Sequence, residues 1–310
     1  MRKLTIITMG IIILSSIANG QNTLVDSIRV FYLGGQSNMD GFGKNADLPE
    51  TLSKPFENVW IFHGNPEVDD MKTGGLGKWD ILKPGHGNRF KSDGRTNNLS
   101  ELFGVELSFA KRLQELYPNE KIALIKYSRG GTSIDSRANH DFGNWDPDYN
   151  RNSGINQYDY FLTTLKKAFN IKDINNDGKD DYLIPSGIIW MQGESDALDE
   201  EVALRYYSNL RRLMDLIRAA LYVDDLPVVI GKISDSGNNE YGKVWKFGEL
   251  VQYAQEKFVS EDGNSAIIRS TMNYKYSDPF HYDSDSYIDL GVKFADAIYR
   301  LNKENTGYEK

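Results

Sequence analysis

The chain has 310 residues, of which 40% are hydrophobic and 26% charged, with a formal net charge of −8 and no cysteine. This length suffices for one large α/β domain with a substantial core. The acidic balance argues against nucleic acid or an anionic membrane as a partner, because both bind basic patches. The lack of cysteine excludes disulfide bonds, thiol nucleophiles and cysteine-ligated zinc.

The first twenty residues have the pattern of a secretory signal peptide. A basic start precedes an apolar run that is shorter than the ~20 residues of a membrane span, and the small residues Ala18 and Gly20 end the segment. We therefore expect residues 1–20 to be removed and residues 21–310 to form a single secreted or periplasmic domain. No later stretch is long and apolar enough to cross a bilayer.

Strands and helices alternate along the rest of the chain. Short apolar runs predict strands, and apolar residues at helical spacing predict helices. The predicted strands are 29–33, 59–62, 121–126, 186–191, 226–233 and 266–269, and the predicted helices are 104–117, 158–170, 200–220, 245–259 and 286–301. This alternation predicts a parallel sheet covered by helices on both faces, a three-layer α/β/α sandwich.

A candidate nucleophile follows the first predicted strand. The strand runs into Gly34-Gly35, and Ser37 comes two positions later. Ligands of open α/β sheets bind at the carboxyl ends of the strands, and glycine permits a sharp turn and a close approach of substrate. Ser37 is therefore placed where a reactive group is expected.

His281 is the candidate general base. Of the four histidines it alone has a patterned context, Ser277–His281 (SDPFH). Asp278, three residues earlier, can accept the Nδ1 proton, which fixes the tautomer and leaves Nε2 free to take a proton from serine. Taken alone, this Asp-x-x-His pattern also fits a surface turn with a solvated histidine.

Donors for an oxyanion are expected where two further strands end. Gly130 and Gly131 follow the third predicted strand, and Gln192 follows the fourth. Together with the N–H of Ser37 they would make a three-donor hole. Each feature also has an ordinary structural interpretation, a tight turn for the glycines and a hydrogen bond at a strand end for Gln192.

These motifs resemble the SGNH hydrolases, in the branch of sialate O-acetylesterases and acetyl xylan esterases. The resemblance covers about residues 28–302 and rests on Gly35–Met39 (GQSNM), Gly130–Ser133 (GGTS), Trp190–Asp196 (WMQGESD) and Asp278–His281 (DPFH). It implies a flavodoxin-like, five-stranded parallel sheet within the sandwich, and the removal of O-acetyl groups from sugars.

The resemblance also implies a role for each matching residue. Ser37 is similar to the nucleophile, His281 to the base and Asp278 to the orienting acid, and the oxyanion donors correspond to Ser37, Gly130 or Gly131, and Gln192. We further expect four neighbouring residues to contact the substrate: Gln36, Asn38, Arg129 and Glu194. An alternative for Glu194, and for Asp196 beside it, is hydrogen bonding to the N–H groups of the next helix start.

Residues 173–181 (DINNDGKDD) match the first part of an EF-hand loop. Oxygen-bearing side chains occupy positions 1, 3, 5 and 9, and Gly178 occupies position 6, although position 12 is Ile184 rather than Glu. We expect a structural Ca²⁺ ion at Asp173, Asn175, Asp177, Lys179 and Asp181. The alternative is a turn rich in Asp and Asn that bonds to itself. No cofactor is expected for catalysis.

The sequence thus predicts a secreted serine esterase that removes O-acetyl groups from an oligo- or polysaccharide. Acetylated xylan or a related plant glycan is the favoured substrate, because no large inserted domain is present, and O-acetylated sialic acid is the alternative. A carbohydrate-binding protein without turnover is the alternative of another class. Four aromatic residues of the predicted loops either stack on sugars or form small loop cores: Trp79, Phe142, Trp145 and Tyr149.

Overall fold

A seven-stranded sheet organises the computed structural model, which describes residues 26–138, 140–150 and 154–306. The strands are β1 (Asp26–Gly35), β3 (Val59–His63), β4 (Trp79–Ile81), β8 (Lys121–Ser128), β9 (Asp181–Met191), β10 (Val228–Gly231) and β11 (Ser265–Ile268). Their order in the sheet is β11-β10-β9-β1-β8-β3-β4, and all neighbours are parallel except β3 and β4.

Five of these strands reproduce the predicted flavodoxin-like sheet. When these five strands are numbered 1 to 5 along the chain, their spatial order β8-β1-β9-β10-β11 is 2-1-3-4-5, which is the flavodoxin arrangement. The predicted fold class is therefore confirmed. The sheet is larger than the expected five strands, because β3 and the antiparallel β4 extend it beyond β8.

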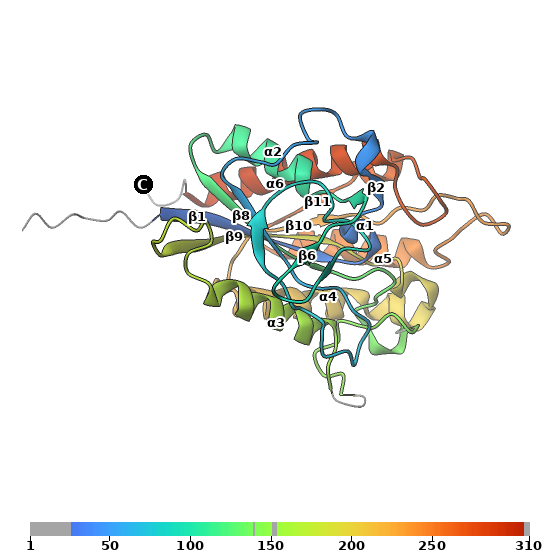
Figure 1. Cartoon of the computed structure of the whole chain (residues 1–310). Helices are drawn as coiled ribbons and strands as arrows, with labels where there is room; N and C mark the ends of the chain where they lie inside the picture. Colours follow the sequence, from blue (N-terminus) through green and yellow to red (C-terminus); the bar gives the residue numbers. More distant parts are fainter. Residues whose placement is uncertain (1–25, 139, 151–153, 307–310) are drawn as a thin grey trace, which may run out of the picture.

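Helices cover both faces of this sheet (Figure 1). They are α2 (Glu106–Leu116), α3 (Gln157–Asn170), α4 (Glu200–Ala220), α5 (Gly248–Glu261) and α6 (Ser284–Thr306). Helices α2 and α6 pack together on one face, whereas α3 and α4 lie on the other, with α5 against α4. All five predicted helices are confirmed with small shifts at their ends. Buried on both faces, strands such as β3, β8 and β10 are nearly continuous apolar runs, as parallel sheets require.

The predicted loop of residues 63–100 contains only short elements. The minor strands of the chain are β2 (Gly43–Lys44), β5 (Lys91–Ser92), β6 (Asn97–Asn98) and β7 (Leu102–Phe103). The short helices are α1 (Ser37–Asp40) and the 3-10 turns η1 (Asn45–Asp47), η2 (Ser136–Ala138), η3 (Asp196–Leu198) and η4 (Ser270–Asn273). Two aromatic residues expected in loops, Trp79 and Trp145, are buried and belong to the core.

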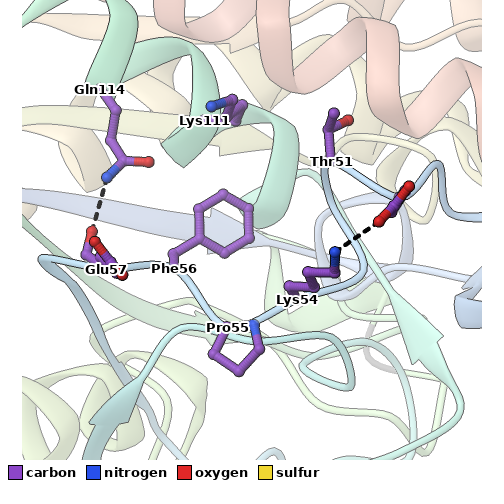
Figure 2. A pocket seen from close by; sticks show the side chains of 8 residues that line it. Thr51, Lys54, Pro55, Phe56, Glu57, Lys111 and Gln114 are labelled. Atoms are coloured by element: carbon purple, nitrogen blue, oxygen red, sulfur yellow. Dashed lines mark hydrogen bonds and ion pairs between the residues drawn. The ribbon is translucent and has the colours of Figure 1, made fainter.

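A surface cavity of about 420 Å³ is lined by residues 50–51, by residues 54–57 and by two side chains of α2, Lys111 and Gln114 (Figure 2). It contains none of the candidate site residues. Within the described ranges, no helix is both long and apolar enough to cross a membrane. The predicted signal peptide, residues 1–20, lies outside the described residues.

Candidate active site

Ser37 lies at the point where the sheet changes direction. Strand β1 is flanked by β8 on one side and β9 on the other, and ligands of doubly wound sheets bind at this switch point. Gly35 ends β1 with φ +142°, and a Cβ there would lie 2.0 Å from the carbonyl oxygen of Met191. Only glycine fits so close to β9. Gln36 then donates its N–H to the same carbonyl at 2.9 Å, and Ser37 opens α1.

Asn38 joins the nucleophile turn to the histidine loop. Its Nδ2 donates to the carbonyl oxygen of Phe280 (3.2 Å), and its Oδ1 accepts the N–H of Tyr282 (3.3 Å), so it bonds the backbone on both sides of His281. Its remaining bonds go to Glu194 Oε1 (2.8 Å) and to the hydroxyl of Tyr287 (2.8 Å). All four hydrogen-bonding positions of this amide are used. The residue after Ser37 therefore holds the residues on either side of His281.

Asp278 orients His281 as the pattern predicts. His281 Nδ1 lies 2.7 Å from Asp278 Oδ2, and Asp278 Oδ1 accepts the N–H groups of Phe280 (2.7 Å) and His281 (2.8 Å). Partial burial opposes ionisation of Asp278, but these hydrogen bonds outweigh it and hold its pKa below the ordinary value. The ring of Phe42 stacks on the imidazole with centroids 3.5 Å apart and planes 8° apart, which fixes the plane of the ring.

Gly130 is the glycine beside Ser37. A Cβ on Gly130 would lie 3.3 Å from the Cβ of Ser37, whereas a Cβ on Gly131 would fall 2.5 Å from the ring of Phe142. The N–H groups of Ser37 and Gly130 donate no hydrogen bond among the described residues. Two backbone donors are thus left free next to the Ser37 side chain, as an oxyanion hole needs.

Gln192 has a different environment from the one expected. Its Nε2 lies 2.6 Å from Asp196 Oδ2, 3.1 Å from the carbonyl oxygen of Thr132 and 3.3 Å from Gln36 Oε1. Its Oε1 accepts the hydroxyl of Tyr206 at 3.0 Å. The side chain is fully buried, and this network leaves no amide hydrogen for an oxyanion. Gln192 is therefore not an oxyanion donor in this structure. Its side chain instead connects Asp196, Thr132 and Tyr206 by hydrogen bonds.

Three of the four residues expected to contact substrate face the interior. Gln36, Asn38 and Glu194 are at most 2% exposed, and each is hydrogen-bonded to the protein. Gln36 Oε1 accepts the N–H groups of Gly193 and Ser195, which secures the turn after β9. The expectation of substrate contacts is thus corrected for these residues, because their side chains stabilise the turns around Ser37 instead.

Arg129 differs from those three residues because its side chain is only partly buried. Its N–H donates to the carbonyl oxygen of Gly35, and its Cζ lies 5.8 Å from the ring centroid of Phe142. Its guanidinium makes no ion pair among the described residues, and its buried Nε has no hydrogen-bond partner there. Substrate contact by Arg129 stays a prediction.

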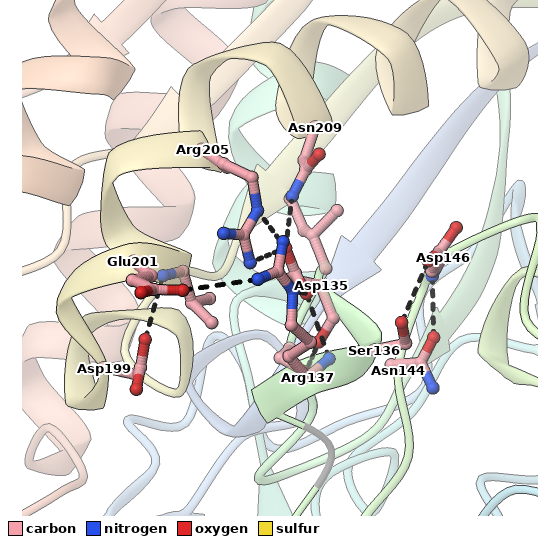
Figure 3. Close-up of polar contacts among 12 residues, drawn as sticks. Asp135, Ser136, Arg137, Asn144, Asp146, Asp199, Glu201, Arg205 and Asn209 are labelled. Carbon is pink, nitrogen blue, oxygen red and sulfur yellow. Dashed lines mark hydrogen bonds and ion pairs between the residues drawn. The ribbon is translucent and has the colours of Figure 1, made fainter.

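The segment 129–146, here called the glycine side of the site, is anchored by two carboxylates. Asp196 accepts the N–H groups of Ile134 (3.0 Å) and Asp135 (3.2 Å), rather than those of a helix start. Asp135 in turn binds Arg205 (2.7 Å) and Asn209 (3.2 Å) of α4 (Figure 3). These bonds fix the glycine side to both η3 and α4.

Two of the buried acids near Ser37 are hard to ionise. Burial raises the pKa of Glu194 to about 7 and that of Asp196 to about 6, although hydrogen bonds from Asn38 and Gln192 act in the opposite direction. Glu194 Oε2 is buried and has no hydrogen-bond partner among the described residues. The histidine loop is therefore supported by a carboxyl group that gains a proton near neutral pH.

A buried lysine that sequence reasoning overlooked supports the end of α1. Lys126 Nζ, fully buried at the end of β8, donates to the carbonyl oxygens of Asp40 (2.8 Å) and His86 (2.7 Å) and to Glu106 Oε2 (2.9 Å). The sequence signal was a charged residue inside an apolar strand. Lys126 thereby connects α1, α2 and the loop at His86. Removal of either Lys126 or Glu106 would leave a buried charge without its partner.

The side chains of the predicted calcium loop are hydrogen-bonded within their own turn. Among the described residues, no three His, Cys, Asp or Glu side chains could hold one ion together. Asp173, Asn175 and Asp177 accept N–H groups of their own turn, and Asp181 accepts the N–H of Ile174 and the amide of Asn175. Lys179 contributes its own N–H to this turn. These hydrogen bonds stabilise the turn, and Ca²⁺ binding there stays a prediction.

The fold is a doubly wound α/β/α sandwich, with Ser37 at the switch point of its sheet and His281 hydrogen-bonded to Asp278. The chain belongs to the family described as carbohydrate esterase, sialic acid-specific acetylesterase, whose model matches residues 27–300. The resemblance noted in the sequence is therefore confirmed. The protein is a carbohydrate acetylesterase, which is a carboxylic ester hydrolase.

Three solved structures have similar folds. A protein from Arabidopsis thaliana is 21% identical with a TM-score of 0.58, over 87% of this chain and 97% of its own. A carbohydrate acetylesterase from Xanthomonas citri is 18% identical with a TM-score of 0.58, over 89% of this chain and 57% of its own. NanS is 16% identical with a TM-score of 0.58, over 90% of this chain and 99% of its own. A comparison with curated proteins gives no match.

Proposed function

We propose that this acetylesterase works through Ser37, His281 and Asp278 and removes O-acetyl groups from a plant polysaccharide such as acetylated xylan. The observation that carries the proposal is the set of bonds made by Asn38. This residue follows Ser37 directly and bonds the backbone on both sides of His281. Asp278 accepts a hydrogen bond from Nδ1 of the same histidine, which leaves Nε2 for the reaction. Nucleophile, base and orienting acid are thereby held in one unit.

The reaction has two halves. Ser37 Oγ attacks the acetyl carbonyl carbon as its proton passes to His281 Nε2, and the N–H groups of Ser37 and Gly130 receive the negative charge on the oxygen. The sugar oxygen leaves with the proton from His281, and the acetyl group stays on Ser37. Water then attacks this ester, His281 takes its proton and returns it to Ser37 Oγ, and acetate leaves.

Acetate release by the chain from residue 21 onward tests the proposal. The substrates are acetylated xylan, O-acetylated sialic acid and an aryl acetate, with Ser37→Ala as the inactive control. We expect the substitution to lower kcat by at least ~10³-fold without unfolding the protein. A rate near that of the wild type in Ser37→Ala would contradict the assignment of the nucleophile. Labelling by a serine-reactive phosphonate gives an independent check.

Sialic acid is the second candidate substrate. Two observations favour it: the name of the matched family, and the guanidinium of Arg129 with no ion-pair partner among the described residues. A sugar carboxylate would give Arg129 the planar, charged partner that guanidinium groups bind best. Release of acetate from O-acetylated sialic acid but not from xylan, lost in Arg129→Met, would favour this candidate.

We also propose that the chain is exported after cleavage before Gln21, supported by the basic start, apolar run and small residues of its N-terminus. The mass of the protein recovered from outside the cytoplasm measures this directly. A full-length mass would contradict it.

Calcium binding at residues 173–181 remains a separate proposal, supported by the spacing of the oxygen-bearing side chains. Each carboxylate oxygen that accepts an N–H in this turn keeps a second lone pair that could bind a cation. If the loop binds Ca²⁺, the melting temperature rises with Ca²⁺ concentration, and Asp173→Ala removes the rise. An unchanged melting temperature at millimolar Ca²⁺ would contradict the site.

A further inference from the structure

Two phenylalanines of this protein are exposed: Phe142 packs against Gly131, and Phe280 is bonded through its carbonyl oxygen to Asn38, the residue after Ser37. All fourteen phenylalanines fall within the described residues, and only Phe142 and Phe280 are exposed, each at 46%. Phenylalanine is among the residues most often buried, so two exposed rings at one site need a reason. Their neighbours and their backbone contacts supply one.

Phe142 lies on the glycine side. Its ring sits against Gly131, whose hypothetical Cβ would fall 2.5 Å from it, and Gly131 is next to the glycine that contacts Ser37. The guanidinium of Arg129 lies 5.8 Å from the ring centroid. The carbonyl oxygen of Phe142 is 3.4 Å from Gln157 Nε2 at the start of α3. Contacts with Gly131 and Arg129 therefore fix the position of Phe142, while nearly half of its surface remains accessible to solvent.

Phe280 lies on the histidine side, next to His281. Its N–H donates to Asp278 and its carbonyl oxygen accepts from Asn38, and the preceding carbonyl of Pro279 accepts the hydroxyl of Ser236 at 2.8 Å. The ring packs at 5.7 Å, centroid to centroid, on Trp245. A backbone held at three consecutive points presents this ring with little freedom to lose on binding.

The two rings contact segments that follow strands on opposite sides of β1. Phe142 contacts the segment that continues β8, which pairs with one edge of β1. The ring of Phe280 contacts Trp245, which comes from the segment that follows β10, beyond the other edge of β1. Ser37 follows β1, and in the sheet β1 lies between β8 and β10. A sugar bearing the scissile acetyl group at Ser37 would have an aromatic ring on either side.

We propose that Phe142 and Phe280 are two sugar-stacking walls, so that the enzyme takes an acetylated sugar within an oligosaccharide and holds its neighbours on both sides. This inference rests on the proposed function of Ser37. Pyranose rings carry apolar C–H faces that pack on aromatic rings, whereas a single free sugar occupies at most one wall. The proposal therefore assigns the site to chains of about three sugars rather than to a monosaccharide.

The test is a chain-length series measured with the wild type and matched variants. The substrates are acetylated xylose, xylobiose, xylotriose and xylotetraose, with an aryl acetate as the small reference. We expect the wild-type KM to fall from xylose to xylotriose. Phe142→Ala and Phe280→Ala each raise the KM for xylotriose by about 3- to 10-fold more than that for the aryl acetate.

Conservative and distant variants separate stacking from a general loss of structure. Phe142→Tyr and Phe280→Tyr keep an aromatic ring and should retain the chain-length dependence that the alanine variants lose. Tyr253→Ala removes a ring that is 70% exposed on α5, and should change none of these constants.

Three results overturn the proposal. They are a wild-type KM that is independent of chain length, alanine variants with equal effects on xylotriose and aryl acetate, and activity confined to monomeric O-acetylated sialic acid. Failure of the nucleophile assignment is distinguishable from these, because acetate release would then persist in Ser37→Ala.

Discussion

The two sides of Ser37 are held by different means. On the histidine side, the single amide of Asn38 bonds a short loop at two backbone positions, next to the protonatable Glu194. On the glycine side, a long segment is anchored by the carboxylates of Asp196 and Asp135, the latter bound by Arg205. The histidine side is held by one residue, Asn38, whereas the support of the glycine side is distributed over several residues. Damage should therefore be more severe on the histidine side.

Asn38→Ala should have the largest effect. It removes four hydrogen bonds and leaves the buried carboxyl of Glu194 and the N–H of Tyr282 unpaired. We expect the free energy of unfolding to fall by about 3 kcal/mol and kcat on an aryl acetate to fall by about 100-fold, because His281 loses its position. A kcat within threefold of the wild type in Asn38→Ala would remove Asn38 from this role.

Tyr287→Phe removes one of the four bonds of Asn38 and should lower the free energy of unfolding by about 1 kcal/mol.

Asp196→Asn breaks the glycine side and should be milder. An amide nitrogen would then face the donors of Gln192 or Ile134. We expect the free energy of unfolding to fall by about 1–3 kcal/mol, and kcat to fall by about tenfold as the segment with Gly130 shifts. Asp199→Asn is the matched control, because asparagine also caps a helix such as α4. If the control variant loses as much activity, the network has no special role.

Glu194→Gln should change how the free energy of unfolding depends on pH. The pKa of Glu194 is about 7 in the folded protein against 4.5 for the free side chain, so the folded state binds the extra proton between these values. Its contribution to stability is present at low pH and is lost as pH rises through about 7. From pH 5 to pH 8 the wild type should lose on the order of 2 kcal/mol that Glu194→Gln retains. Urea denaturation at both pH values measures this, and parallel losses would contradict the assignment.

Much of the fold could be predicted because burial leaves a periodic pattern. Helices such as α4 and α6 carry apolar residues at helical spacing, and β8 and β9 are apolar runs ending in polar turns. The three residues of β4 and the two-residue strands had no such signal, since they pair at the edge or within loops. Their pairing depends on contacts between distant segments rather than on local pattern.

The roles of the polar residues near Ser37 were harder to predict than their presence. Ser37 and the Asp278–His281 pattern were found from strand ends and spacing. Gln36 and Asn38 were expected to contact substrate because they neighbour the nucleophile, yet both face inward. A polar residue beside a catalytic group has the same sequence signature whether it bonds the substrate or the protein. Burial in the folded chain decides between the two.

The stacking of Phe42 on His281 determines how a ligand can enter. One face of the imidazole is covered by a parallel ring at 3.5 Å, so molecules that reach His281 must come from the uncovered face or along the Nε2 edge. Approach is therefore one-sided, and the two prochiral faces of an ester are presented unequally to Ser37. Inhibitors with a chiral phosphonate should accordingly react at different rates as their two enantiomers.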